Sequence, residues 1–110
     1  MAITSAVCNT FKTEVLKAVH NFTNGGNTFR LALYTSSATL NKSTTAYTTS
    51  NEVANGNGYT TKGAALTNVT PALSGDTAVC DFSNISFTSA SFTANGCLIF
   101  NDTASGDPSV

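Results

Sequence analysis

His20 is the only histidine in this chain of 110 residues, so a Ser-His-Asp or Cys-His catalytic arrangement would have to use it. It lies near the C-terminal end of a helical sequence pattern, where a partly exposed imidazole is favourable. Cys8 lies on the same pattern, roughly 18 Å away along a helix axis, so the two side chains cannot meet within one chain. A small hydrolase would need His20 in a cleft beside a nucleophile, and we predict a structural role for it instead.

The six carboxylates form no calcium-binding run and no H-E-x-x-H zinc motif. Asp81 lies inside a strand pattern and Asp102 at a strand end, and we expect both to cap turns or to face solvent. The Asn-Gly-Asn-Gly sequence at 55–58 lacks the spacing of a phosphate-binding loop and predicts a turn. The sequence therefore predicts no catalytic residue, no metal site and no cofactor, and so a protein that is not an enzyme.

The three cysteines, Cys8, Cys80 and Cys97, include no C-x-x-C pair and show neither a disulfide framework nor a zinc-site spacing. We expect buried free thiols that behave as small apolar residues. A Cys80–Cys97 bridge between neighbouring strands is the alternative in an oxidising environment.

Three tyrosines, Tyr34, Tyr47 and Tyr59, fall in strand patterns, as do Phe87 and Phe92. Most of these rings are needed for a core. A tyrosine, however, joins an apolar ring to a polar tip and is common at protein interfaces. The three tyrosines are therefore the candidate interface residues.

Charged residues make up only 10% of the chain, with a net charge of −1, against roughly 25% in typical soluble chains. The five basic residues are scattered, which argues against nucleic-acid binding. No stretch approaches a membrane span and no signal-peptide pattern opens the chain, so we expect synthesis in a cytoplasm and no membrane partner. A nearly neutral surface repels its own copies weakly and favours self-association.

The only helical pattern covers residues 5–22, with Ser5 as a plausible N-cap and Asn-Gly-Gly at 24–26 as the stop. Apolar residues recur there at spacings of three and four, as one face of a helix requires. This predicted stripe contains Cys8, Phe11, Val15, Val19 and Phe22. We expect it to lie against the sheet of the same domain.

Beyond residue 27 the apolar period drops to two, which predicts strands separated by Asn, Gly and Ser turns. The expected strands cover residues 28–35, 77–84, 85–93 and 97–102, with a short strand near 45–48 and an extended segment over 59–73. We expect the apolar run at 97–102 to be a central strand.

The patterns together predict a single domain over residues 1–110, with the helix at about 5–22 and a β body at about 28–110. The fold class is mainly β: an antiparallel β-sandwich or barrel-like roll with one N-terminal α-helix. The closing Pro-Ser-Val reads as the start of a further strand. We expect that strand to be incomplete, supplied by a neighbour or removed.

Four phrases in this order resemble a family of short virion proteins encoded by tailed bacteriophages, including marine and cyanobacterial phages. The phrases are FKTEVLKAVHNF, FRLALYTSSATL, AYTTSNEVANGNGYTTKGAALTNVTP and VCDFSNISFTSASFTANGCLIFND. The resemblance covers most of residues 1–102 and implies a structural component of the particle, with no enzyme activity and no cofactor. Members of the family run on into further strands, which agrees with the unfinished strand.

The resemblance leaves two roles open within a virion made in a host cytoplasm. The first is a capsid decoration or cement protein that binds the outer shell through protein contacts, as a trimer or other multimer. The second is a tail, collar or fibre-attachment protein. A carbohydrate-binding β-sandwich module is a weaker alternative, because the chain has no tryptophan and its aromatic residues are needed for the core.

Overall fold

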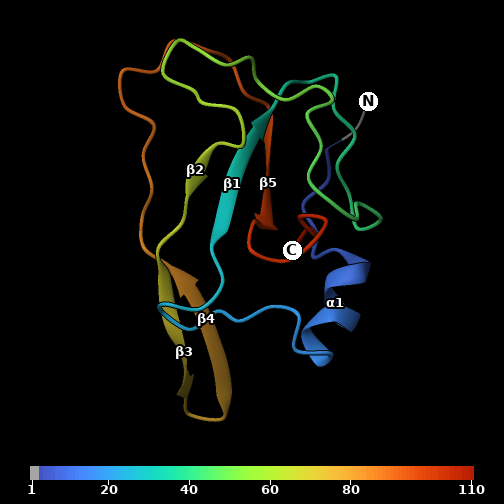
Figure 1. Cartoon of the computed structure of the whole chain (residues 1–110), viewed down its shortest axis with the longest axis vertical. Coiled ribbons are helices and arrows are strands. Elements are labelled where there is room, and N and C mark those ends of the chain that lie inside the picture. Colours follow the sequence, from blue (N-terminus) through green and yellow to red (C-terminus); the bar gives the residue numbers. More distant parts are fainter. Residues whose placement is uncertain (1–2) are drawn as a thin grey trace.

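The computed structural model describes residues 3–110 (Figure 1). Within them, one helix, α1 (Asn9–Leu16), is followed by five strands. The strands are β1 (Phe29–Tyr34), β2 (Ala64–Ala65), β3 (Asn68–Ser74), β4 (Thr77–Phe82) and β5 (Gly96–Asn101). They form an antiparallel sheet in the order β2-β1-β5 and a separate antiparallel pair, β3–β4. The predicted mainly β fold with one N-terminal helix is confirmed, and the larger sheet does not close into a barrel.

Helix α1 begins later than the sequence pattern predicts, so the N-cap assigned to Ser5 is wrong. The Thr4 N–H donates to the Leu40 carbonyl at 2.8 Å, and the Asn9 N–H donates to the Lys42 carbonyl at 2.7 Å. These two bonds hold the intervening residues against the segment that follows β1. The helix can therefore begin only once the chain leaves that segment.

The helix also ends at Leu16, well before the predicted stop at residues 24–26. Ala18 has φ 60° and the Val19 N–H donates to the Glu14 carbonyl at 3.0 Å, as in a Schellman motif. Glycine usually occupies this left-handed position, because a Cβ there costs roughly 1–2 kcal/mol. Because the apolar spacing continues beyond Leu16, the sequence pattern does not show that the helix ends there.

The predicted stripe of α1 is only partly buried. Phe11 packs inward, but Val15 is 41% exposed, and its neighbour Leu16 is 88% exposed. Phe11 meets the ring of Phe22 with centroids 5.9 Å apart, and Phe22 stacks on Phe29 of β1 at 4.3 Å. One ring of the helix therefore connects it to the sheet of the same chain.

Strand β1 is the centre of the larger sheet, and its two faces contribute to two different cores. One face belongs to a core cluster made of Ala32, Tyr34, Ala38, Leu40, Leu98 and Phe100. Phe29 belongs to an aromatic cluster made of Phe11, His20, Phe22, Phe29 and Phe82. The aromatic cluster connects α1, β1 and the end of β4.

The strand expected over residues 97–102 forms as β5, but it lies at an edge of the sheet rather than at its centre. Its apolar run reflects the burial of Leu98 and Phe100 on the core face. Only the far end of its outer side is paired: Asn101 N–H donates to the Pro108 carbonyl and Val110 N–H donates to the Ile99 carbonyl, both at 2.9 Å.

Residues 85–93 form no strand, contrary to the prediction. Phe87 and Phe92 instead place their rings 5.8 and 5.6 Å from the ring of Tyr59. Ser89 has φ 53°, which breaks the extended backbone. The alternating pattern therefore records contacts with a single buried tyrosine rather than pairing with a neighbouring strand.

Two further segments differ in detail. The extended segment at 59–73 divides into β2 and β3, because Lys62 and Gly63 just before β2 have φ 76° and 70°. The short strand expected near 45–48 is reduced to one bridge between Ala46 and Pro108. The turn predicted at 55–58 is confirmed, with Gly56 at φ 116° and bridged to Tyr59.

Candidate functional site

The hydroxyls of two predicted tyrosines converge on one carboxylate. Tyr47 donates to Glu52 Oε1 at 2.6 Å, and Tyr59 donates to Glu52 Oε2 at 2.5 Å. The backbone of Glu52 bridges to Tyr34, whose own hydroxyl donates to the Thr48 carbonyl at 2.6 Å. The three tyrosines therefore gather around the loop between β1 and β2 and hold it against the sheet.

This tyrosine group lies mostly inside the chain. Tyr34 is 0% and Tyr59 2% exposed, while Tyr47 is partly buried. Burial raises the pKa of Tyr34 to about 12, and the negative charge of Glu52 adds to the rise. Burial, followed by the hydrogen bond to Glu52, raises the pKa of Tyr47 and Tyr59 as well. The interface role of the tyrosines stays a prediction, and of the three only Tyr47 is partly open to solvent.

Lys62 ties this tyrosine group to the end of β5. Its backbone N–H donates to Glu52 Oε2 at 2.8 Å, and its Nζ donates to Asp102 at 3.0 Å and to Asp107 at 3.1 Å. The ammonium also lies 5.7 Å from the centre of the Tyr47 ring. Hydrogen bonds to the two aspartates raise the pKa of Lys62. Asp102 thus forms an ion pair, where the sequence predicted a capping or solvated residue.

His20 is held on both ring nitrogens. Nε2 donates to Glu14 at 3.0 Å, and Nδ1 accepts a hydrogen bond from the Asn101 amide nitrogen at 3.1 Å. The Asn101 oxygen accepts the backbone N–H groups of Thr103 and Ala104, which fixes the orientation of the amide and places the ring proton on Nε2. The side chain of His20 has no exposed area. The ring therefore has no free nitrogen for proton transfer, which fits the predicted structural role.

The cysteines are free but not uniformly buried. Cys8 is buried, whereas Cys80 on β4 and Cys97 on β5 are exposed, so the expectation of three buried thiols is wrong. The Cys80–Cys97 bridge is not formed, because the two residues lie in different sheets. Among residues 3–110, no group of three or more His, Cys, Asp or Glu residues could hold a metal ion.

Strands β3 and β4 form an exposed hairpin, called here the arm (residues 68–82). It extends from the three-stranded sheet along the longest axis of the molecule (Figure 1). Every residue from 69 to 81 is exposed, and the apolar side chains of Leu73, Val69 and Val79 are 74%, 44% and 45% exposed. A two-stranded hairpin with neither face covered is marginally stable in water. The arm therefore presents apolar surface that its own chain does not bury.

The base of the arm is anchored by one buried amide. Asn68 Nδ2 donates to the carbonyls of Thr23 and Asn27, at 3.1 and 2.9 Å, and Asn24 donates to the Asn68 carbonyl at 2.9 Å. At the other strand, the Phe82 ring lies 5.7 Å from Phe29 in the aromatic cluster. The arm is thus anchored at its base, while the residues along its length are exposed to solvent.

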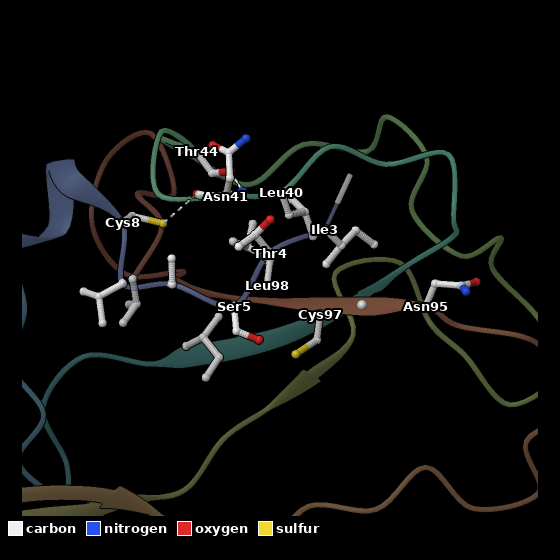
Figure 2. A pocket seen from close by; sticks show the side chains of 15 residues that line it. Ile3, Thr4, Ser5, Cys8, Leu40, Asn41, Thr44, Asn95, Cys97 and Leu98 are labelled. Carbon is white, nitrogen blue, oxygen red and sulfur yellow. Dashed lines mark hydrogen bonds between the residues drawn. The ribbon is translucent and has the colours of Figure 1, made fainter. Parts of the chain in front are cut away.

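A groove lies beside β5 and is also lined by residues 3–8 and by Leu40, Asn41 and Thr44 (Figure 2). Its volume is about 530 Å³, and it is called here the β5 groove. The lining residues of β5 run from Gly96 to Ile99, and none of the residues that line the groove has a charged side chain. Ile3 lies against Gly96, where an added Cβ would approach the isoleucine side chain to 2.7 Å.

No protein-family model, curated protein or solved structure matches this chain. In the described part of the chain, no helix is long and apolar enough to cross a membrane.

Sequence reasoning did not identify Glu52, Asn101 or the exposure of the arm. Tyr59, a partner of Glu52, lies seven positions along the same loop, and His20, a partner of Asn101, lies 81 positions away. No regular spacing along the chain marks either pair. The arm does carry Thr, Ser and Asp among its apolar residues on both sides of a Ser-Gly-Asp turn.

Proposed function

We propose that the protein is a structural component of a tailed-phage virion, made in the host cytoplasm. Its role is capsid decoration or cement: it binds the outer shell through protein–protein contacts, as a trimer or other multimer. The resemblance of four sequence phrases supplies the class of particle. The observation that carries the proposal is the arm, which keeps apolar side chains in solvent although the chain has its own core.

The exposed apolar side chains of the arm would gain free energy if a partner buried them. Burying apolar surface is worth about 25 cal/mol per Å², and the arm exposes Leu73, Val69 and Val79 without using that gain. A net charge of −1 leaves little repulsion between neighbouring copies. Binding to a shell subunit or another copy would recover the burial energy.

The hydrogen-bonded polar groups described above support a structural role rather than a catalytic one. His20 has both ring nitrogens engaged, and the Glu52 oxygens accept two tyrosine hydroxyls and a backbone N–H. Polar groups whose hydrogen bonds are all made within the chain stabilise the fold, whereas a general acid or base needs a proton or lone pair that can reach a substrate.

Quantitative mass spectrometry of purified particles tests this role. Decoration predicts hundreds of copies per particle, and a tail, collar or fibre-attachment part predicts about six to a few tens. Absence of the chain from purified particles would contradict membership in the virion.

A double variant, Leu73→Glu with Val79→Glu, tests the arm. It should fold normally by circular dichroism but fail to bind shells that lack the protein. The matched control is Leu16→Glu, since Leu16 is 88% exposed and lies on α1, outside the arm. Equal shell binding by the arm variant and the control would contradict the proposed docking role of the arm.

A further inference from the structure

Four Asn-Gly pairs occur in the chain, at 24–25, 55–56, 57–58 and 95–96. In such a pair the glycine nitrogen can attack the Cγ of the asparagine side chain, which expels ammonia and closes a cyclic imide. One water molecule then opens the imide at either carbonyl and leaves aspartate or isoaspartate. Glycine favours the attack because it has no side chain to hinder its nitrogen. The reaction therefore needs a glycine N–H that is accessible and not hydrogen-bonded.

The fold restrains three of the four pairs. The Gly56 N–H donates to a backbone carbonyl across its own turn, at 2.7 Å. Gly58 is packed against backbone, since an added Cβ would lie 2.7 Å from the Ser89 carbonyl oxygen. Gly96 belongs to β5, and an added Cβ there would lie 2.7 Å from the Ile3 side chain. In each of these pairs the glycine is either hydrogen-bonded or crowded by its neighbours.

The pair at 24–25 is open by comparison. Asn24 and Gly25 are both exposed, and a Cβ added to Gly25 would meet nothing within 4 Å. The Gly25 N–H donates to no backbone carbonyl within residues 3–110. Gly25 has φ 86° and lies in a turn that is closed by a bond of 2.7 Å from the Gly26 N–H to the Thr23 carbonyl. Of the four glycine nitrogens, that of Gly25 is therefore the least restrained.

Asn24 also holds the base of the arm. Its Nδ2 donates to the Asn68 carbonyl at 2.9 Å, and its backbone N–H donates to Thr70 Oγ1 at 3.0 Å. The Asn68 side chain returns a bond to the Thr23 carbonyl, at 3.1 Å. The turn at 23–26 and the first residues of β3 are thus connected directly through Asn24.

We propose that Asn24 is a site of spontaneous deamidation, and that its conversion to aspartate or isoaspartate releases the base of the arm. The side-chain nitrogen leaves as ammonia, so the Asn68 carbonyl loses its donor. The carboxylate that replaces the amide accepts hydrogen bonds only and carries a negative charge, so it repels that carbonyl oxygen. Isoaspartate also adds one carbon to the main chain within the turn, which shifts the turn relative to β3.

The same contacts make the reaction depend on the arm. The Asn24 side chain reaches the Gly25 nitrogen only after its bond to Asn68 has broken, which is a local opening at the base of the arm. Deamidation is therefore fastest in molecules whose arm base is open, and its product prevents the base from closing again. The inference concerns the chain alone and holds whether or not the protein belongs to a virion.

The first test follows the folded protein during incubation at mildly alkaline pH and physiological temperature. Peptide mapping by mass spectrometry measures the replacement of NH₂ by OH at each of the four pairs, and an isoaspartate methyltransferase labels the isomerised product. Asn24 should be converted several-fold faster than the other three asparagines. In urea, where no fold restrains the pairs, the four rates should come close together. Conversion of Asn55, Asn57 or Asn95 as fast as that of Asn24 in the folded protein would overturn the assignment.

The variant Gly25→Ala tests the chemistry. It adds a methyl group beside the attacking nitrogen, in open space, and leaves the Asn24 amide in place. Conversion of Asn24 should slow several-fold. Undiminished conversion would overturn attack by the glycine nitrogen.

The variant Asn24→Asp tests the consequence, because it introduces one product directly. Hydrogen exchange of residues 68–82, measured against residues 29–34 of β1, should become roughly five-fold faster, as expected for the loss of about one hydrogen bond. Asn55→Asp is the matched control: it adds the same charge, keeps the oxygen that accepts the Thr61 N–H, and should leave exchange of the arm unchanged.

The aged protein gives the same comparison without a variant. Deamidated molecules carry one more negative charge than the starting chain, so ion-exchange chromatography separates them. Their arm should exchange faster than the arm of the unmodified fraction. Unchanged exchange of the arm in both Asn24→Asp and the deamidated fraction would overturn the release of the arm.

Discussion

The three-stranded sheet and the arm are both built from short antiparallel strands, yet they differ in what supports them. Around β1, Phe29, Ala32 and Tyr34 have no exposed area. In the arm, every residue from 69 to 81 is exposed. The comparison teaches that strands form in both regions, but that burial decides which region contributes most to the stability of the chain.

The largest expected effect concerns a glycine of the sheet region. Gly63 has φ 70°, and an added Cβ would lie 1.8 Å from the Leu31 carbonyl oxygen. Because that neighbour is backbone, it cannot move aside, and Gly63→Ala should cost more than about 3 kcal/mol and yield mostly insoluble chain. Gly75→Ala, at the turn of the arm, is the control: its φ is 64° with nothing within 4 Å, and it should cost about 1 kcal/mol. If the Gly63→Ala protein is soluble and stable, that result would contradict the close approach of Gly63 to the Leu31 carbonyl oxygen.

The second effect concerns the carboxylate shared by the tyrosines. Glu52→Ala leaves the hydroxyls of Tyr47 and Tyr59 without their acceptor, which should lower the free energy of unfolding by roughly 2–4 kcal/mol. Asp81→Ala in the arm removes only a local bond to the Phe82 N–H and should cost below about 1 kcal/mol. Urea titrations followed by circular dichroism compare the two. Similar midpoints would mean that the tyrosine group contributes little.

The third effect is a dependence on alkaline pH. The pKa of Tyr34 is raised from 10.0 to about 12 in the folded chain. A raised pKa contributes stability that is fully present below pH 10 and is lost as the pH climbs from there toward the folded pKa. The free energy of unfolding should fall by about 1.4 kcal/mol per pH unit for each such tyrosine.

Urea titrations of the original chain and of Tyr34→Phe, at about pH 8 and about pH 11, measure this fall. The variant should lose less stability between the two pH values, because one buried hydroxyl no longer titrates. An equal loss in both proteins would contradict the assignment to Tyr34.

The smallest effect belongs to the arm. Leu73→Ala removes a side chain that is 74% exposed, and stability should change by no more than about 0.5 kcal/mol. The matched variant Leu98→Ala removes a side chain that is 6% exposed in the core cluster, and it should cost about 2–5 kcal/mol. Equal losses would show that the free chain already buries its arm, and the contrast between the two regions would fail.

The sequence predicted what depends on neighbouring residues. The alternation at 28–35 and 77–84 became β1 and β4, and Ser-Gly-Asp became the turn between β3 and β4, with Gly75 at φ 64°. The predicted end of the helix was wrong because Ala18 occupies the left-handed position after the helix, where a glycine usually marks the end in the sequence. Local patterns thus reported element type well and element ends poorly.

The residues that hold the site together could not be predicted from the sequence, for a different reason. Glu52 meets Tyr59 seven positions away, and Asn101 meets His20 across 81 positions, so their roles exist only after the chain has folded. The aromatic residues at 85–93 misled for the same reason, since Phe87 and Phe92 alternate like a strand but pack on Tyr59.

The buried amides of Asn68 and Asn101 affect how this protein can be produced. Each begins an Asn-X-Thr sequence, the acceptor for N-linked sugar. In a eukaryotic secretory route, the oligosaccharide is attached while the chain is still emerging, before these side chains are enclosed. A glycan on Asn101 would occupy the position of the amide that orients His20, and one on Asn68 would block the anchoring of the arm. Secreted expression in such cells should therefore yield misfolded, glycosylated chain, whereas a bacterial cytoplasm adds no sugar.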